Sequence, residues 1–213
     1  MKKVSENLAL LTRVRQATLA MVAELTQQQL DWQPGEGKWS AGEHLDHLLM
    51  AEKLYRDAIA KLIERVKTGG IAELRLSFED LNVRPNLLPK EALPLAEIPL
   101  LVGQLFVPRA VKESLVRYRL LPAQRPDAAS PDAGKEKQEL LDGLRSSLEQ
   151  TNHLIDENPD LDYHNMTLLH PILGRNDVPL LVKLTALHEE RHQSHIADLV
   201  KAWGGRRKSK KPN

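Results

Sequence analysis

The stretch LHEERHQSHIADL, residues 187–199, holds three of the 8 histidines of this 213-residue chain. His188, His192 and His195 follow one another at spacings of four and three residues, so a helix places them on one side. The apolar residues on the same stripe are Leu181, Leu184 and Leu199. Because a buried imidazole without a partner is costly, we expect a core helix over residues 178–203 whose histidines share a partner.

A second pair of histidines stands near the start of another predicted helix, in WSAGEHLDHLLMAE, residues 39–52. Ser40 and Glu43 have the spacing of a capping box, and Trp39 stands where a hydrophobic staple belongs. This helix is predicted to end near residue 67, before a Gly-Gly pair. His44 and His47 fall on its apolar side, so imidazoles interrupt this stripe as well.

Two further amphipathic helices are predicted over residues 4–29 and 134–157. The proline-rich connection of residues 71–135 separates the second helix from the third, and we expect a short helix within it at RAVKESLVRY, residues 109–118. The pattern predicts an all-α four-helix bundle with a long crossover between its second and third helices, which then run parallel. No sheet of three or more strands is expected.

The composition limits the classes of function. Hydrophobic residues make up 41% of the chain but aromatic residues only 4%, which predicts an aliphatic core. The formal net charge of +1 predicts no contact with nucleic acid, and no apolar run reaches the roughly 20 residues of a membrane span. Without a signal peptide or any cysteine, the protein is expected to be cytoplasmic. Residues 1–203 are expected to form the bundle domain, and the basic residues 204–213 a disordered tail.

The histidines predict a transition-metal site. His188 and His192 are one helical turn apart, a spacing at which two rings hold one ion. Since the chain has no cysteine, other ligands must come from His, Asp or Glu. If the two histidine-bearing helices are neighbours, His44 or His47 completes a three-histidine site in the bundle core. The alternative is a set of core histidines bonded to the backbone or to one another.

Both histidine segments resemble those of the DinB-like superfamily, which includes the bacillithiol S-transferase-like proteins. Members of that family are four-helix bundles in which three histidines hold a divalent metal. The resemblance places the first ligand at His47, in the run EHLDHL, and the other two at His188 and His192. His195 with the following isoleucine, and the segment HPILG from His170, match the family pattern as well.

Three imidazoles on one ion leave coordination positions open, as in catalytic sites. The resemblance implies Zn²⁺ or Ni²⁺ as the cofactor and a transferase that conjugates a low-molecular-weight thiol to an electrophile. It also leaves a homodimer open, because the surface helices of such bundles often pair. Two alternatives remain: a metal-dependent hydrolase that uses a metal-bound water, and a non-catalytic, metal-stabilised binding protein in which His44 supplies a fourth ligand.

The run HEERH, residues 188–192, also fits the H-E-x-x-H signature of zinc proteases, with Glu189 as the base. However, no glutamate follows Glu190 to serve as a third ligand, and the metzincin pattern fails at His195. We therefore interpret Glu189 as a solvent-facing residue.

His195 is predicted to lie outside the ligand set. It is seven residues from His188, which is roughly 10 Å along a helix, so both rings cannot easily reach one ion. We expect His195 to be a catalytic residue that accepts a proton near the bound thiol or water; a packed structural histidine is the alternative. The remaining histidines, interpreted as surface or turn residues, are His153, His164 and His170.

Overall fold

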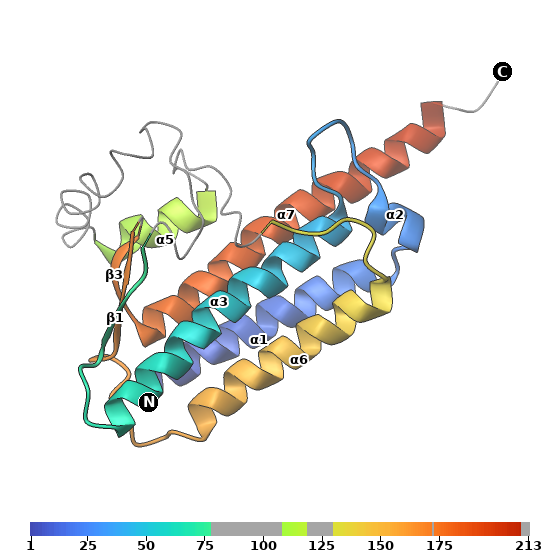
Figure 1. Cartoon of the computed structure of the whole chain (residues 1–213). Coiled ribbons are helices and arrows are strands. Elements are labelled where there is room, and N and C mark those ends of the chain that lie inside the picture. The colour runs from blue at the N-terminus through green and yellow to red at the C-terminus, as the bar shows by residue number, and fades with distance from the viewer. Residues whose placement is uncertain (78–107, 119–129, 172, 210–213) are drawn as a thin grey trace.

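The computed structural model of the chain describes residues 1–77, 108–118, 130–171 and 173–209. The long helices of the bundle are α1 (Lys2–Ala23), α3 (Ala41–Lys67), α6 (Lys137–Asp156) and α7 (Val178–Ser209). They lie side by side, with α1 and α7 running in one direction and α3 and α6 in the other (Figure 1). The predicted all-α four-helix bundle is confirmed. So is the parallel course of the two helices that the long crossover joins.

The start and end of α3 follow from its sequence. The side chain of Ser40 accepts a hydrogen bond from the backbone of Glu43, and the Glu43 carboxylate accepts one from the backbone of Ser40. This is the predicted capping box, and it orients the first turn, which carries His44 and His47. The helix ends at Lys67, where the Gly-Gly pair predicted it.

Two helix boundaries differ from the expectation. The first predicted helix, residues 4–29, is divided into α1 and a short helix α2 (Gln27–Asp31), because Thr26 and Gln29 form a second capping box. At the other end of the chain, α7 continues to Ser209, into the segment expected to be a disordered tail. Residues 210–213 of that tail lie outside the described residues.

The expectation that no sheet of three strands forms was wrong. The strands β1 (Glu73–Arg75), β2 (Thr167–His170) and β3 (Gly174–Asp177) pair in that order, β1 parallel and β3 antiparallel to β2. Each has only three or four residues, too few for the period-two alternation that reveals a strand. The short helix predicted in the crossover is confirmed as α5 (Arg109–Tyr118), which packs against α7. Most of the crossover, residues 78–107 and 119–129, lies outside the described residues.

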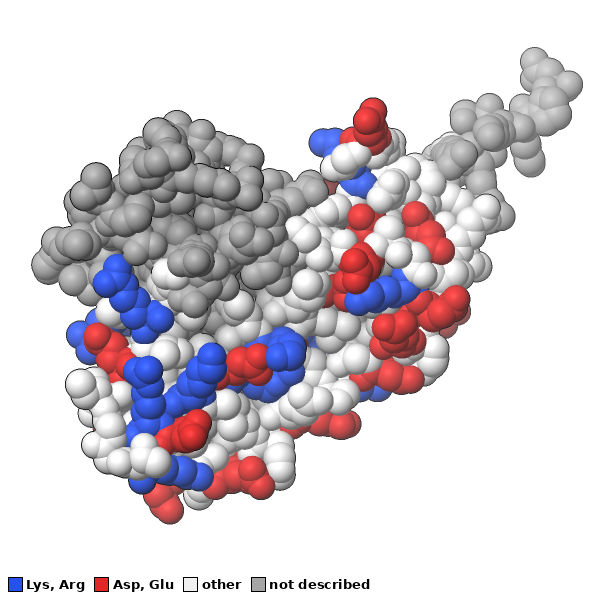
Figure 2. Space-filling model, viewed as in Figure 1, with Lys and Arg blue, Asp and Glu red and all other residues white. Residues whose placement is uncertain are grey.

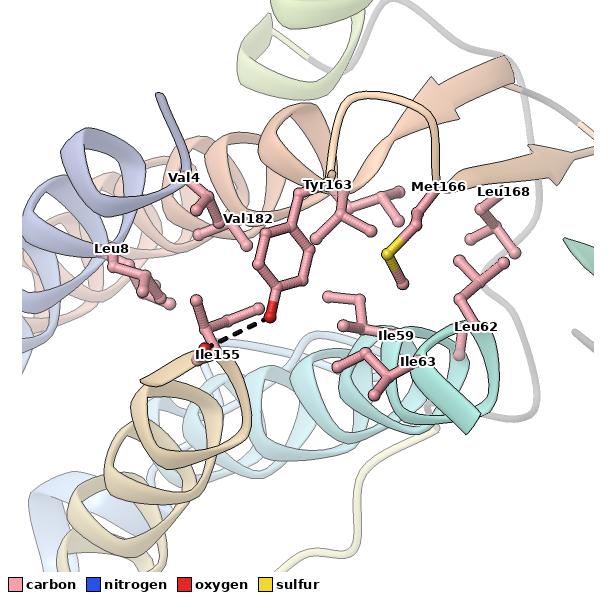
Figure 3. Close-up of a cluster of buried hydrophobic side chains, with 14 of the residues drawn as sticks. Val4, Leu8, Ile59, Leu62, Ile63, Ile155, Tyr163, Met166, Leu168 and Val182 are labelled. Atoms are coloured by element: carbon pink, nitrogen blue, oxygen red, sulfur yellow. Dashed lines mark hydrogen bonds between the residues drawn. The ribbon is translucent and has the colours of Figure 1, made fainter. Parts of the chain in front are cut away.

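Two clusters, one in each half of the bundle, make up most of the apolar core of the described residues, and a smaller one consists of Leu173, Leu180 and Leu184. Figure 3 shows the cluster near the N-terminus, where Val4, Ile59 and Val182 from α1, α3 and α7 meet. Tyr163 enters this cluster from the loop after α6, and its hydroxyl donates a hydrogen bond to the Ile155 carbonyl at 3.2 Å. The other cluster surrounds the start of α3. The two halves therefore fix the helices at both ends.

A buried polar network lies between the two apolar clusters and joins all of the long helices. Arg15 of α1 is 1% exposed and donates hydrogen bonds to Glu52 of α3 at 2.7 Å and to Glu189 of α7 at 2.9 Å. It also donates to the backbone carbonyl of Leu144 on α6. Burial alone would lower the pKa of Arg15, but the two carboxylates more than offset this and raise it. Arg15 therefore remains a cation in the core.

The two glutamates of the network have further partners. Thr151 of α6 donates to Glu52 at 2.8 Å, and Thr18 of α1 donates to Glu189 at 2.6 Å. Several hydrogen bonds on each carboxylate offset the desolvation cost that two buried charges would otherwise carry.

No helix in the described part of the chain is both long and apolar enough to cross a bilayer. On the face shown in Figure 2, basic and acidic side chains are intermixed, in keeping with the net charge of +1.

Replacing Arg15 by methionine should destabilise the protein by about 3–5 kcal/mol, because two buried carboxylates would lose their cation. Urea unfolding followed by circular dichroism measures this change. The matched control is Arg145→Met, which removes an ion pair with Asp142 whose side chains are 50% and 60% exposed, and should cost less than about 1 kcal/mol. Equal stability of the two variants would contradict the role given to Arg15.

Candidate metal centre

Three imidazoles from two neighbouring helices converge between α3 and α7. Nε2 of His188 lies 3.3 Å from Nε2 of His47 and 3.1 Å from Nε2 of His192. One ligand atom from each ring lies within 4.8 Å of the others, so the group could hold a metal ion. His47 and His192 are buried, and His188 is partly exposed. The structure thus brings together the three histidines that the resemblance implied as ligands.

The spacing of these nitrogens is compatible with ligation of one ion, although each pair is also within hydrogen-bond distance. A tetrahedral ion with nitrogen ligands at about 2.0–2.1 Å holds two of them about 3.3–3.4 Å apart. Nε2 of His188 faces two other ring nitrogens at once, whereas one ring nitrogen carries only one proton or one lone pair. A cation among the three satisfies every lone pair together. The residues present therefore fit a divalent ion.

The protonation state of the rings also fits metal binding. Burial lowers the pKa of His192, and the neighbouring His188, His47 and Arg191 lower it further. Burial, then Arg191 and His47, push the pKa of His188 well below its ordinary value. Both rings are therefore neutral at pH 7, which is the form that ligates a metal.

His44 contacts a member of the three-histidine group but is not part of it. Its Nδ1 lies 2.8 Å from Nδ1 of His192, on the side of that ring opposite the converging Nε2 atoms. If Nε2 of His192 offers a lone pair to an ion, Nδ1 carries the proton and donates it to His44. This bond fixes both the tautomer and the orientation of His192. The sequence analysis left two ligand roles open for His44, either in place of His47 or as a fourth ligand. The group of three that could hold a metal does not include it.

Trp39 covers this cluster. Its ring centroid lies 4.9 Å from that of His47 and 5.2 Å from that of His44. His44 is the fourth residue after the cap at Ser40, so the Trp39–His44 contact is the predicted staple between the residue before the cap and the first turn. The same contact makes the indole a wall of the site, which the staple pattern alone did not indicate.

His195 lies beside the three-histidine group. Its ring stacks on His44, with centroids 5.4 Å apart and an interplanar angle of 10°, and its centroid is 5.8 Å from that of His192. The group that could hold a metal does not include it. Its predicted catalytic role stays a prediction.

The interpretation of Glu189 as a solvent-facing residue was wrong. Glu189 is 1% exposed and pairs with Arg15. The reason is that α7 packs against α1 as well as α3, so it has two buried sides. Gln193 faces α1 too, where it donates to the Val14 carbonyl at 2.8 Å. The Glu189 carboxylate is held against α1 by Arg15. It therefore cannot act as the general base beside the three-histidine group, as the corresponding glutamate of a zinc protease does.

The remaining histidines lie away from the centre. His153 and His164 are exposed and lie beside Glu157 and Asp177, as expected of surface residues. His170 was expected at the surface or in a turn but is 6% exposed in β2. Its Nδ1 accepts a hydrogen bond from the Leu173 backbone, and burial, followed by the charge of Lys112, lowers its pKa to about 4.

Arg191 borders the centre and was not among the predicted residues. Its Nη2 lies 3.2 Å from Nε2 of His192, and its Nη1 donates to the Val116 carbonyl of α5 at 3.0 Å. The signal for it was present, because Arg191 is three residues from His188 and therefore lies near it on the same side of α7.

The His192→Ala variant should lose stoichiometric metal, because two imidazoles remain where three converge. The His195→Ala variant should keep its metal. Elemental analysis after purification in the presence of zinc measures both. Full occupancy in His192→Ala, or equal loss in His195→Ala, would contradict the assignment.

The His44→Ala variant should bind the metal about 10–100-fold more weakly, because His192 would lose the partner that fixes its tautomer. Competition with a chromophoric chelator measures the dissociation constant. The exposed His153→Ala serves as the control and should leave it unchanged. An unchanged dissociation constant in His44→Ala would show that the bond between the two rings does not support the site.

Comparison with known proteins agrees with this geometry. The family model of the DinB superfamily matches residues 10–196, which include all of the converging histidines. No curated protein and no solved structure was found to match the chain. Because the family model covers most of its length, the chain belongs to the DinB superfamily.

Proposed function

We propose that the protein is a metal-dependent transferase that conjugates a low-molecular-weight thiol to an electrophile. His47, His188 and His192 would hold the ion, Zn²⁺ or Ni²⁺. The observation that carries the proposal is the convergence of three imidazole nitrogens in a group that has no fourth member among the described residues. Three protein ligands are typical of a catalytic site, whereas structural zinc sites have four.

When bound, a divalent ion in such a site supplies a Lewis acid that favours the thiolate form of a thiol, which is the nucleophile. Residues around the ion would position its ligands and exclude water. His44 holds the ring of His192 in place through the 2.8 Å bond between their Nδ1 atoms. Trp39 packs on His47 and limits the access of water from its side.

His195 is the candidate for moving a proton at this site. Its ring stacks on His44, which in turn contacts His192, so it lies one imidazole away from a ligand. A neutral imidazole there can accept the proton that a thiol releases when it becomes a thiolate. The resemblance of the histidine segments to those of bacillithiol S-transferase-like proteins supports thiol transfer over hydrolysis.

A conjugation assay with 1-chloro-2,4-dinitrobenzene tests the proposal. The thiol sulfur forms a bond to the ring carbon, chloride leaves with the electron pair of the carbon–chlorine bond, and the thiol proton passes to solvent. Zinc- or nickel-loaded protein should accelerate this reaction with at least one small thiol, and His192→Ala should react at the uncatalysed rate because it lacks the metal.

The control for this assay is Arg145→Met, a change on the exposed side of α6 that should leave the rate unchanged. A metal-loaded protein that conjugates no thiol from a panel of cysteine, glutathione and cysteamine would contradict thiol transfer. Hydrolysis of a p-nitrophenyl ester by the same sample would then favour the hydrolase.

A further inference from the structure

The charge at the three-histidine group favours an anionic ligand. All members of the group are imidazoles, which are neutral when they ligate a metal, so they cancel none of the charge of a divalent ion. Arg191 adds a fixed positive charge at the edge of the same space, with Nη2 3.2 Å from Nε2 of His192. Two positive groups this close, in a partly buried site, attract an anion more strongly than they would in water.

The two residues before Arg191 in the sequence are glutamates, and each carboxylate pairs with another arginine. Glu189 pairs with Arg15 on the α1 side of the helix, and Glu190 pairs with Arg117 of α5 at 2.5 Å. Neither carboxylate therefore neutralises the space among the three histidines. Among the described residues, the group that could hold a metal contains no carboxylate, so the small molecule that binds there would supply the anion.

Arg191 is also held in place. Its Nη1 donates to the Val116 carbonyl, and α5, which carries Val116, is joined to α7 by the Lys183–Glu113 and Arg117–Glu190 ion pairs. These contacts fix the orientation of the guanidinium, and its Nη2 lies next to the three-histidine group. A positioned guanidinium is well suited to a planar carboxylate, to which it donates two parallel hydrogen bonds.

We propose that Arg191 binds a carboxylate of the thiol substrate, so that the substrate carries a thiol and a carboxylate separated by a short spacer. The sulfur would bind the metal, and the carboxylate would accept hydrogen bonds from the guanidinium of Arg191. This inference rests on the metal site of the proposed function, and it adds a residue that selects the substrate. The spacer must be short because Nη2 is in contact with a ligand nitrogen.

Binding of two matched thiols to the zinc-loaded protein tests the inference. 3-Mercaptopropionate and 2-mercaptoethanol have the same thiol on the same two-carbon chain, and only the first carries a carboxylate. Isothermal titration should show that the wild-type protein binds 3-mercaptopropionate about tenfold more tightly, or more. In Arg191→Met this preference should fall to near one, whereas binding of 2-mercaptoethanol should be unchanged.

The control is Arg145→Met, which removes an exposed cation of α6 outside the α5–α7 contact and should keep the preference. Arg191→Lys should keep part of it, because the charge remains while the fork is lost. Metal content is measured for every variant before titration. Equal binding of the two thiols by the wild-type protein, or an unchanged preference in zinc-loaded Arg191→Met, would overturn the proposal.

Succinate, which has carboxylates and no thiol, separates this inference from thiol transfer. If succinate binds in an Arg191-dependent way while neither thiol binds, the arginine is a carboxylate anchor and thiol transfer is refuted. If no carboxylate probe binds in an Arg191-dependent way, the anchor is refuted, whether or not the protein conjugates thiols.

Discussion

Arg15 lies between the two apolar halves of the core, where it pairs with Glu52 and Glu189. Apolar packing tolerates small rotations of a helix, but three buried charges can be satisfied only in a narrow range of positions. Glu189 directs one side of α7 at α1. His188 and His192 lie about 100° and about 60° around the helix from Glu189, both on the side that faces α3, because each residue of a helix advances about 100°. The convergence of the rings therefore depends on an ion pair on the adjacent side of the same helix.

The long crossover contributes to the site through α5. Its carbonyl at Val116 holds Arg191, and its ion pairs with α7 fix where that guanidinium points. Lys135, at the end of the crossover, pairs with the buried Asp46 in the first turns of α3, next to His47. Both contacts place parts of the crossover against the two helices that carry the histidines. The connection is thus more than a link between parallel helices.

Sequence patterns predicted the bundle because its helices are long and their start signals are local, as at Ser40 and Glu43. The three converging histidines were predictable because imidazoles interrupt two apolar stripes and match a family pattern. Arg15 and Glu52 interrupt the apolar stripes of α1 and α3 in the same way, and this signal could have revealed the polar network. Glu189 was misassigned because one buried stripe was assumed for α7, whereas the helix has two neighbours. The short strands and the contacts of Arg191 depend on chain segments far apart in sequence, which no local pattern reports.

X-ray absorption spectroscopy of the zinc-loaded protein at the metal edge tests the central claim, an open centre formed by three imidazoles, most directly. It should show three imidazole nitrogens at about 2.0–2.1 Å and at least one position that an added thiol takes up as a new sulfur scatterer at about 2.3 Å. A spectrum with four imidazole ligands that is unchanged by every thiol would contradict the account.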